Sequence, residues 1–182
     1  MKKILFLLIA CLYGFTCMAQ QTALTDTVSI RLPDGAKKIN REQSIDFVKT
    51  QFDNYQALLY RVTLYKFDYR YEADHVLLLF SPPNNGKKIS DDFLLVKSKP
   101  LGEEHEMRKR PNRTTEFKTI NNNQVLIVYD TYKQNTIGDY DVYCINGAHD
   151  RYLHVVLNFD LSYKEKAKKM VDDILQGLKF TK

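Results

Sequence analysis

The chain has 182 residues, of which 44% are hydrophobic and 27% are charged. Its net charge of +5 is mild, which argues against a dedicated nucleic-acid binder, because such proteins concentrate much more positive charge. The length fits one ordinary domain with a sizeable core.

The N-terminal residues have the three parts of a secretory signal peptide: two lysines, a short apolar run and small residues before Ala19. The apolar run is too short to cross a bilayer as a helix. We therefore expect cleavage after Ala19, which removes residues 1–19 as the signal peptide. Residues 20–182 then form a single domain of a periplasmic or secreted protein, with no transmembrane segment after cleavage. A lipoprotein attached through Cys11 stays open as the alternative, because residues 8–11 have lipobox residue types.

The first elements follow from periodicity and capping signals. Residues 20–26 are polar and predict a flexible lead-in, whereas residues 27–33 (TVSIRLP) alternate and predict a half-buried strand. Asn40 with Gln43 three positions later has the pattern of a capping box. Behind it an apolar stripe with spacings of three and four predicts a helix over about residues 41–54: Ile45, Val48, Phe52, Tyr55 and Leu59.

Residues 65–72 alternate between aromatic and charged side chains. This period of two predicts an antiparallel strand with one dry face and one charged, solvated face. The dry face would carry the aromatic residues and the solvated face the charged ones: Tyr65, Phe67, Tyr69 and Tyr71 against Lys66, Asp68, Arg70 and Glu72. Residues 75–80 (HVLLLF) predict a second, central strand after a turn at residues 73–74.

The pattern weakens and then becomes regular again. Residues 91–96 fit a short helix or a strand, and residues 102–113 are highly charged and predict an exposed excursion. Four strands of a β-meander follow, over residues 116–120, 124–132, 140–146 and 151–160, with an Asn146-Gly147 turn before the last. A helix then begins at a capping box of Ser162 and Glu165, with Gly177 as its terminator. Its apolar face is Ala167, Met170, Val171, Ile174 and Leu178.

These elements predict a single, sandwich-like α+β domain. Its antiparallel sheet, which contains the meander, is flanked by an N-terminal and a C-terminal helix.

Two stretches resemble the PsbP-like superfamily, which includes Mog-type and other exported bacterial proteins. The opening VSIRLPDGAKKI resembles its strand-then-Leu-Pro start, and RYLHVVLNFDLSYKEKAKKMVDDILQGLKF resembles its last strand and capped helix. The resemblance implies an antiparallel sheet flanked by helices and a non-enzymatic accessory role. It carries over no ligand-binding residue.

Cys144, His149, Asp150 and His154 are the residues that could support nucleophilic catalysis or bind zinc. Cys144 lies inside an alternating strand, where free cysteine is usually a small buried hydrophobe. The two histidines are five residues apart across a turn, which is not the spacing of a common zinc site. We therefore expect no catalytic residue, no metal site and no cofactor.

Two groups of side chains could bind a partner. His105, Arg108, Lys109, Arg110 and Arg113 form the densest basic cluster, which a solvated loop also explains. Such a cluster suits an anionic envelope component or an acidic protein.

Tyrosines could form an aromatic binding surface, although we expect the row from Tyr65 to Tyr71 to be core. Tyr129 and Tyr132 differ in parity, so at least one of them should face outward.

The expected function is a non-catalytic interaction or accessory module whose partner is another envelope protein or an anionic envelope component. The alternative is a periplasmic carrier of a small lipid or sugar. An enzyme that uses Cys144 is a third, weaker hypothesis.

Overall fold

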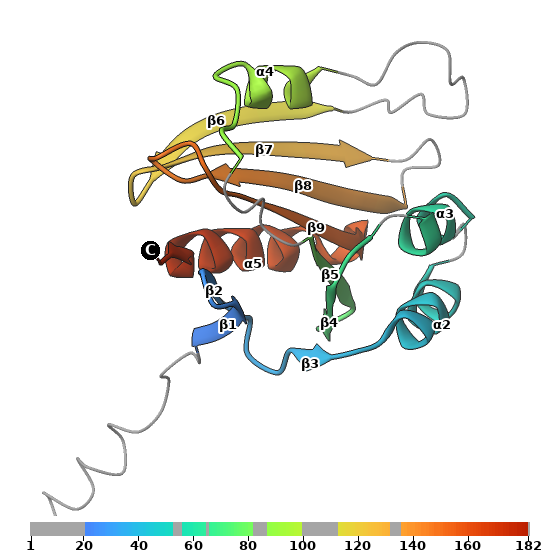
Figure 1. The fold of residues 1–182 in the computed structure, drawn as a ribbon. Helices are drawn as coiled ribbons and strands as arrows, with labels where there is room; N and C mark the ends of the chain where they lie inside the picture. Colours follow the sequence, from blue (N-terminus) through green and yellow to red (C-terminus); the bar gives the residue numbers. More distant parts are fainter. Residues whose placement is uncertain are drawn as a thin grey trace, which may run out of the picture.

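The computed structural model describes residues 21–52, 56–64, 66–81, 87–99, 113–131 and 136–181. The predicted signal peptide and Cys11 lie outside these residues. The described residues form an α+β fold with antiparallel sheets, as the sequence predicts (Figure 1). The larger sheet has seven strands in the order β3 (Lys37–Lys38), β4 (Tyr69–Ala73), β5 (Val76–Ser81), β9 (Tyr152–Asp160), β8 (Ile137–Ile145), β7 (Asn123–Thr131) and β6 (Thr114–Ile120).

The predicted meander is confirmed, since β6, β7, β8 and β9 pair consecutively and antiparallel. The tight β6–β7 turn is made by Asn121 and Asn122, whose φ angles of 50° and 62° suit asparagine. In the β8–β9 loop, the side-chain oxygen of Asn146 accepts hydrogen bonds from the backbone nitrogens of Asp150 and Arg151. Side-chain chemistry at these two turns therefore fixes the register of the meander.

A second sheet joins the two ends of the described chain. It contains β1 (Gln21–Thr25), β2 (Val28–Arg31) and β10 (Lys179–Phe180), with β2 in the middle. The prediction of a flexible lead-in over residues 20–26 is therefore wrong for β1. Its only buried side chain is Leu24, so the strand lacks the apolar alternation by which strands are recognised.

The helix α5 (Lys164–Gly177) and the small sheet cover one face of the large sheet. The predicted capping box at Ser162 is wrong, because Asp160 accepts from the Ser162 backbone instead and caps the 3-10 turn η2 (Leu161–Tyr163). Gly177 is the last residue of α5, and a Cβ there would lie 2.3 Å from the Cβ of Arg31. Glycine is needed at this position for the close approach of β2.

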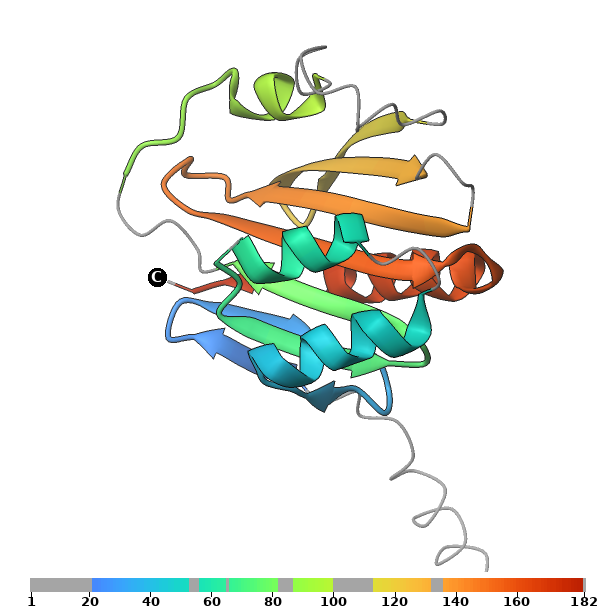
Figure 2. The ribbon, with the colours of Figure 1, turned by 90° about the vertical axis from the view of Figure 1, so that its right-hand side faces the viewer.

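The opposite face is covered by α2 (Arg41–Gln51), α3 (Gln56–Leu64) and α4 (Phe93–Ser98), as Figure 2 shows for α2 and α3. The capping box of Asn40 and Gln43 is confirmed, and residues 91–96 contribute to the helix α4. The chain leaves the helical conformation at Phe52, which is buried, and α3 follows as a separate helix that periodicity did not reveal. None of the helices in the described part of the chain is long and apolar enough to span a bilayer.

The prediction of a strand over residues 65–72 is wrong for its first half, which is not a strand. The prediction that Arg70 faces solvent is also wrong. β4 begins only at Tyr69, and Phe67 packs with α2 and α3 whereas Tyr71 packs on the α5 side. Arg70 is 7% exposed and donates to the Ser44 hydroxyl at 2.9 Å. Its face of the sheet lies beneath α2 and α3, so a charged residue there needs hydrogen bonds inside the protein.

Candidate functional site

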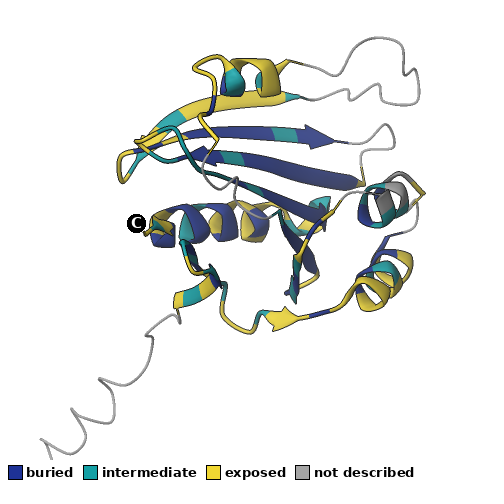
Figure 3. Ribbon diagram, in the orientation of Figure 1, coloured by how far each residue is buried: buried dark blue, intermediate teal, exposed yellow. Residues whose placement is uncertain are grey.

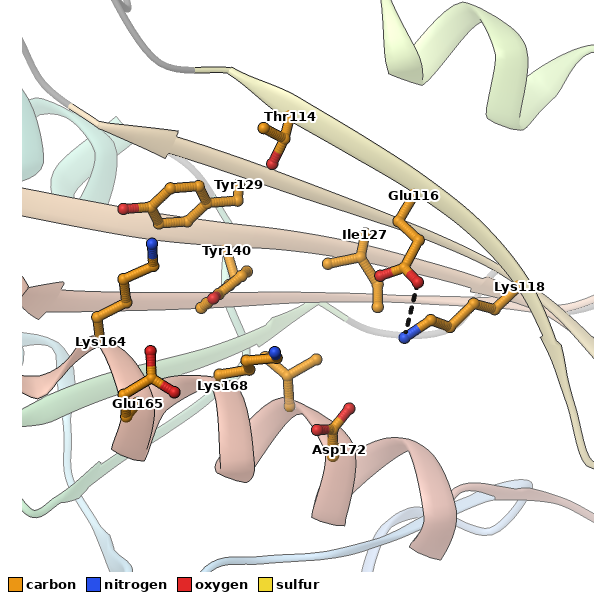
Figure 4. Close-up of a pocket in the computed structure, with 11 residues that line it drawn as sticks. Thr114, Glu116, Lys118, Ile127, Tyr129, Tyr140, Lys164, Glu165, Lys168 and Asp172 are labelled. Carbon is orange, nitrogen blue, oxygen red and sulfur yellow. Dashed lines mark ion pairs between the residues drawn. The ribbon is translucent and has the colours of Figure 1, made fainter.

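A hollow of about 270 Å³ lies between the outer strands of the large sheet and α5 (Figure 4). Residues of β6, β7 and β8 line one side, and the first three turns of α5 line the other. We call this hollow the β6–α5 groove. Its lining residues are Thr114, Glu116, Lys118, Ile127, Tyr129, Tyr140, Lys164, Glu165, Lys168, Val171 and Asp172.

One end of the groove is aromatic. The rings of Tyr129 on β7 and Tyr140 on β8 are 5.1 Å apart, because the two residues are direct partners in the β7–β8 register. The Lys164 ammonium on α5 lies 4.7 Å from the centre of the Tyr129 ring. A cation over an aromatic face is attracted to the ring quadrupole, and this contact holds the start of α5 against β7.

The other end carries charges of both signs. Lys118 and Glu116, two residues apart on β6, form an ion pair at 3.0 Å. Across the groove, α5 presents Lys168 and Asp172 (Figure 4). With Lys164 and Glu165, the lining contains three lysines and three acidic residues. The groove is therefore electrically balanced and suits a zwitterionic or mixed surface better than a highly charged ligand.

The uncharged ring of Tyr140 forms the floor of the aromatic end of the groove. Burial, with smaller contributions from Tyr129, Glu165 and Asp172, raises the pKa of Tyr140 to about 12. Its phenol is therefore protonated at neutral pH. It offers the groove a ring and a hydroxyl, and it is no general base.

Of the residues predicted to bind a partner, Tyr129 lies in the groove and is half-buried. Arg113 lies elsewhere, where one of its nitrogens donates to Asp130 at 3.0 Å and another lies 3.4–3.5 Å from carbonyls of residues 97–99. Its guanidinium thus joins the end of α4 to β7, and its role toward a partner stays a prediction. His105, Arg108, Lys109, Arg110 and Tyr132 lie outside the described residues.

A buried acidic cluster, which the sequence analysis missed, lies on the opposite face of the sheet. Asp130 on β7 and Asp139 on β8 are direct register partners, and Asp141 is two residues farther along β8. Carboxylate oxygens of all three lie within 4.8 Å of one another. The only local signal is that acidic residues interrupt two otherwise apolar strands.

Two arginines offset most of the negative charge of this cluster. Arg61 on α3 bridges Asp139 and Asp141, and its contacts with both Asp141 oxygens are 2.5 Å. Arg113 pairs with Asp130. Burial alone would raise the pKa of Asp141, but Arg61 and a hydrogen bond from His154 hold it well below its usual range.

Oxygen-rich clusters suit Mg²⁺ or Ca²⁺, so the donor set alone would fit a metal. Here the guanidinium groups of Arg61 and Arg113 already contact the carboxylates of all three aspartates, and a cation would have to displace them. We interpret the cluster as a network that attaches α3 and the end of α4 to the sheet.

The geometry opposes a Cys–His pair. Cys144 points into the α5-side core, where burial raises the pKa of its thiol to about 12. His154 is the register partner of Tyr143, whose ring it stacks on at 4.3 Å, and it hydrogen-bonds Asp141 on the other face. His149 lies in the β8–β9 loop and contacts Asp91 and Gln124.

A scan against protein-family models finds no family that matches this chain, and a search of curated proteins finds no similar sequence. Membership of the PsbP-like superfamily therefore stays a prediction from the residues quoted above.

Proposed function

We propose that this chain is a non-catalytic binding module of the cell envelope, and that the β6–α5 groove is its binding site. The observation that carries the proposal is the aromatic end of the groove, where Tyr129 is half-buried over Tyr140 and beside Lys164. Tyrosine offers a rigid ring and a hydroxyl at low entropic cost, which suits it to binding surfaces. The envelope location rests on the predicted signal peptide, and the accessory role agrees with the PsbP-like resemblance.

The dimensions of the groove favour a protein partner. Pockets for small ligands commonly have volumes of about 300–1,000 Å³ and enclose most of the ligand. The groove, at about 270 Å³, falls just below this range. A side chain or short segment from a protein surface fits such a site, and the balanced lysines and acids would pair with polar groups around it.

The small-ligand alternative rests on the same tyrosines, because stacked rings also bind the faces of sugars. Thermal unfolding with and without a sugar panel, together with organic extraction of the purified protein, tests it. A raised melting temperature or a recovered lipid would favour the carrier over the protein-binding module.

The central experiment is crosslinking of a C-terminally tagged full-length chain in its native envelope, followed by mass spectrometry of co-purifying proteins. We expect one stoichiometric partner, and we expect Tyr129→Ala to reduce its recovery. The matched control is Tyr69→Ala on β4, which also removes a half-buried tyrosine with a lysine, Lys38, over its ring. Equal recovery with Tyr129→Ala and Tyr69→Ala would reject the groove as the binding site.

The same preparation tests the predicted signal peptide and the basic cluster. A mature chain that begins at Gln20 would support export by cleavage, whereas an acylated Cys11 would support the lipoprotein. Alanine at Arg108, Lys109 and Arg110 should weaken recovery if the basic cluster contributes to binding. Unchanged recovery would remove the cluster from the proposal.

A further inference from the structure

The two edges of the large sheet differ in how they are protected. β3, at one edge, has only two residues, and both are exposed lysines. Short strands and lysines are common means of preventing edge-to-edge association. β6, at the other edge, has seven residues and carries Phe117, which is 53% exposed. Within the described residues no strand pairs with its outer edge.

Exposed apolar side chains lie on β6 and on α4. Phe117, Leu95 and Val96 are the large hydrophobic residues that are more than half exposed in the described part of the chain. Phe117 pairs with Leu126, which packs in the same cluster as Leu94 of α4. β6 and α4 thus belong to the same side of the molecule, and Figure 3 shows β6 exposed beside the buried β7 and β8.

The sequence of β6, TTEFKTI, is self-complementary in an antiparallel pair centred on Phe117. In that register Phe117 faces Phe117 of a second copy, and Glu116 faces Lys118 in both directions. Thr115 likewise faces Thr119. Aromatic pairs, opposite charges and threonine pairs are the cross-strand combinations that stabilise antiparallel strands.

We propose that β6 pairs with β6 of a second copy of this chain, which joins the two large sheets into one continuous sheet across a two-fold axis. The charge pattern favours a second copy over an unrelated segment. In an antiparallel pair of identical strands, Glu116 of each chain lies opposite Lys118 of the other. The Glu116–Lys118 ion pair within each chain would become part of a square of four alternating charges, two from each chain. This proposal does not rest on the proposed function of the groove.

The test is the mass of the protein, produced from its full-length gene, by sedimentation velocity over a dilution series. We expect the wild-type mass to rise toward twice that of one chain as concentration increases. Lys118→Glu alone should give a monomer because it places two glutamates against two glutamates. Glu116→Lys alone should also give a monomer because it places lysines against lysines.

Two rescue experiments are specific to the proposed register. The double variant Glu116→Lys/Lys118→Glu restores both opposite-charge pairs, so dimerisation should return. An equimolar mixture of the two single variants should form a mixed dimer, because one chain supplies two lysines and the other two glutamates.

The matched control is Lys169→Glu, which removes the exposed Lys169–Asp173 ion pair on α5 and should leave the mass unchanged. Circular dichroism verifies that every variant is folded. A wild-type protein that stays monomeric, single variants that dimerise normally, or a mixture that fails to associate would each overturn the proposal.

Discussion

Substitution of Arg61 tests whether the buried ion-pair network attaches α3 to the large sheet. The Arg61 side chain is 13% exposed and is shared by Asp139, at 1% exposure, and Asp141, at 10%. Arg61→Met keeps most of the side-chain volume and removes the charge, which leaves two buried carboxylates without their common counter-ion. Removal of one partner from a buried ion pair costs about 3–5 kcal/mol, so the variant should lose that much unfolding free energy near neutral pH.

The loss should depend on pH in a defined direction. The pKa of Asp141 is lowered in the folded protein, so its stabilising contribution is complete above the unfolded carboxyl pKa of about 3.9. It is lost as the pH falls below that value toward the folded pKa. In Arg61→Met, the Asp141 carboxyl lacks the guanidinium charge that lowers its pKa, so this pH-dependent contribution to stability is reduced. The difference between the two proteins should therefore be largest at neutral pH and shrink in acid.

Urea unfolding at several pH values, followed by far-UV circular dichroism, measures this difference; the chain contains no tryptophan to report by fluorescence. The matched control is Arg41→Met, because Arg41 is exposed and donates only to the Thr63 carbonyl among the contacts described. We expect it to change stability by less than about 0.5 kcal/mol. If Arg61→Met costs no more than this control, or costs the same at every pH, the buried network is not what attaches α3 to the sheet.

Three further predictions concern single buried positions. Asn158 is fully buried, and neither polar atom of its side chain has a hydrogen-bond partner in the described part of the chain. Asn158→Leu should therefore raise the free energy of unfolding, measured in urea, by about 1–3 kcal/mol. A destabilised variant would show that the amide is hydrogen-bonded in solution. Gly177→Ala should lower the free energy of unfolding by about 1–3 kcal/mol, because the new Cβ meets the Arg31 backbone. The control Gln176→Ala, at the exposed neighbouring position, should change it very little. Equal effects of the two variants would refute the close approach of Gly177 to β2. Cys144 is buried, and its thiol has a pKa raised to about 12, so a thiol reagent near pH 8 should label it only after urea unfolds the protein. Rapid labelling of Cys144 in the native state would contradict its placement in the core.

The sequence predicted best what depends on local patterns. The meander strands are separated by turns that contain Asn121-Asn122 and Asn146-Gly147, and the Asn40–Gln43 pair marks the start of α2. It failed where a tertiary contact overrides the pattern. Residues 65–72 alternate like a half-solvated strand, yet Arg70 lies under α2 and donates to Ser44.

The candidate site was predictable only in part. Tyr129 could be singled out by its type and parity, but its partner Lys164 lies on a distant helix. Arg61 and Asp141 are separated by 80 residues, and no spacing rule joins them. Such contacts are specified by the packing of α3 on the sheet, and a single sequence does not display that packing.

The position of β9 sets an order of events for a chain that folds as it emerges. β9 lies between β5 and β8, and its pairing with β5 joins residues as far apart as Val76 and Phe159, which are 83 positions apart along the chain. Until β9 is available, β4–β5 and β6–β8 are separate sheet fragments, each with an open edge. Pairing between residues so distant in sequence closes long loops and is slow. Both fragments therefore keep an open edge until β9, at residues 152–160 of 182, joins them. Any truncation that removes β9 divides the sheet rather than shortening it.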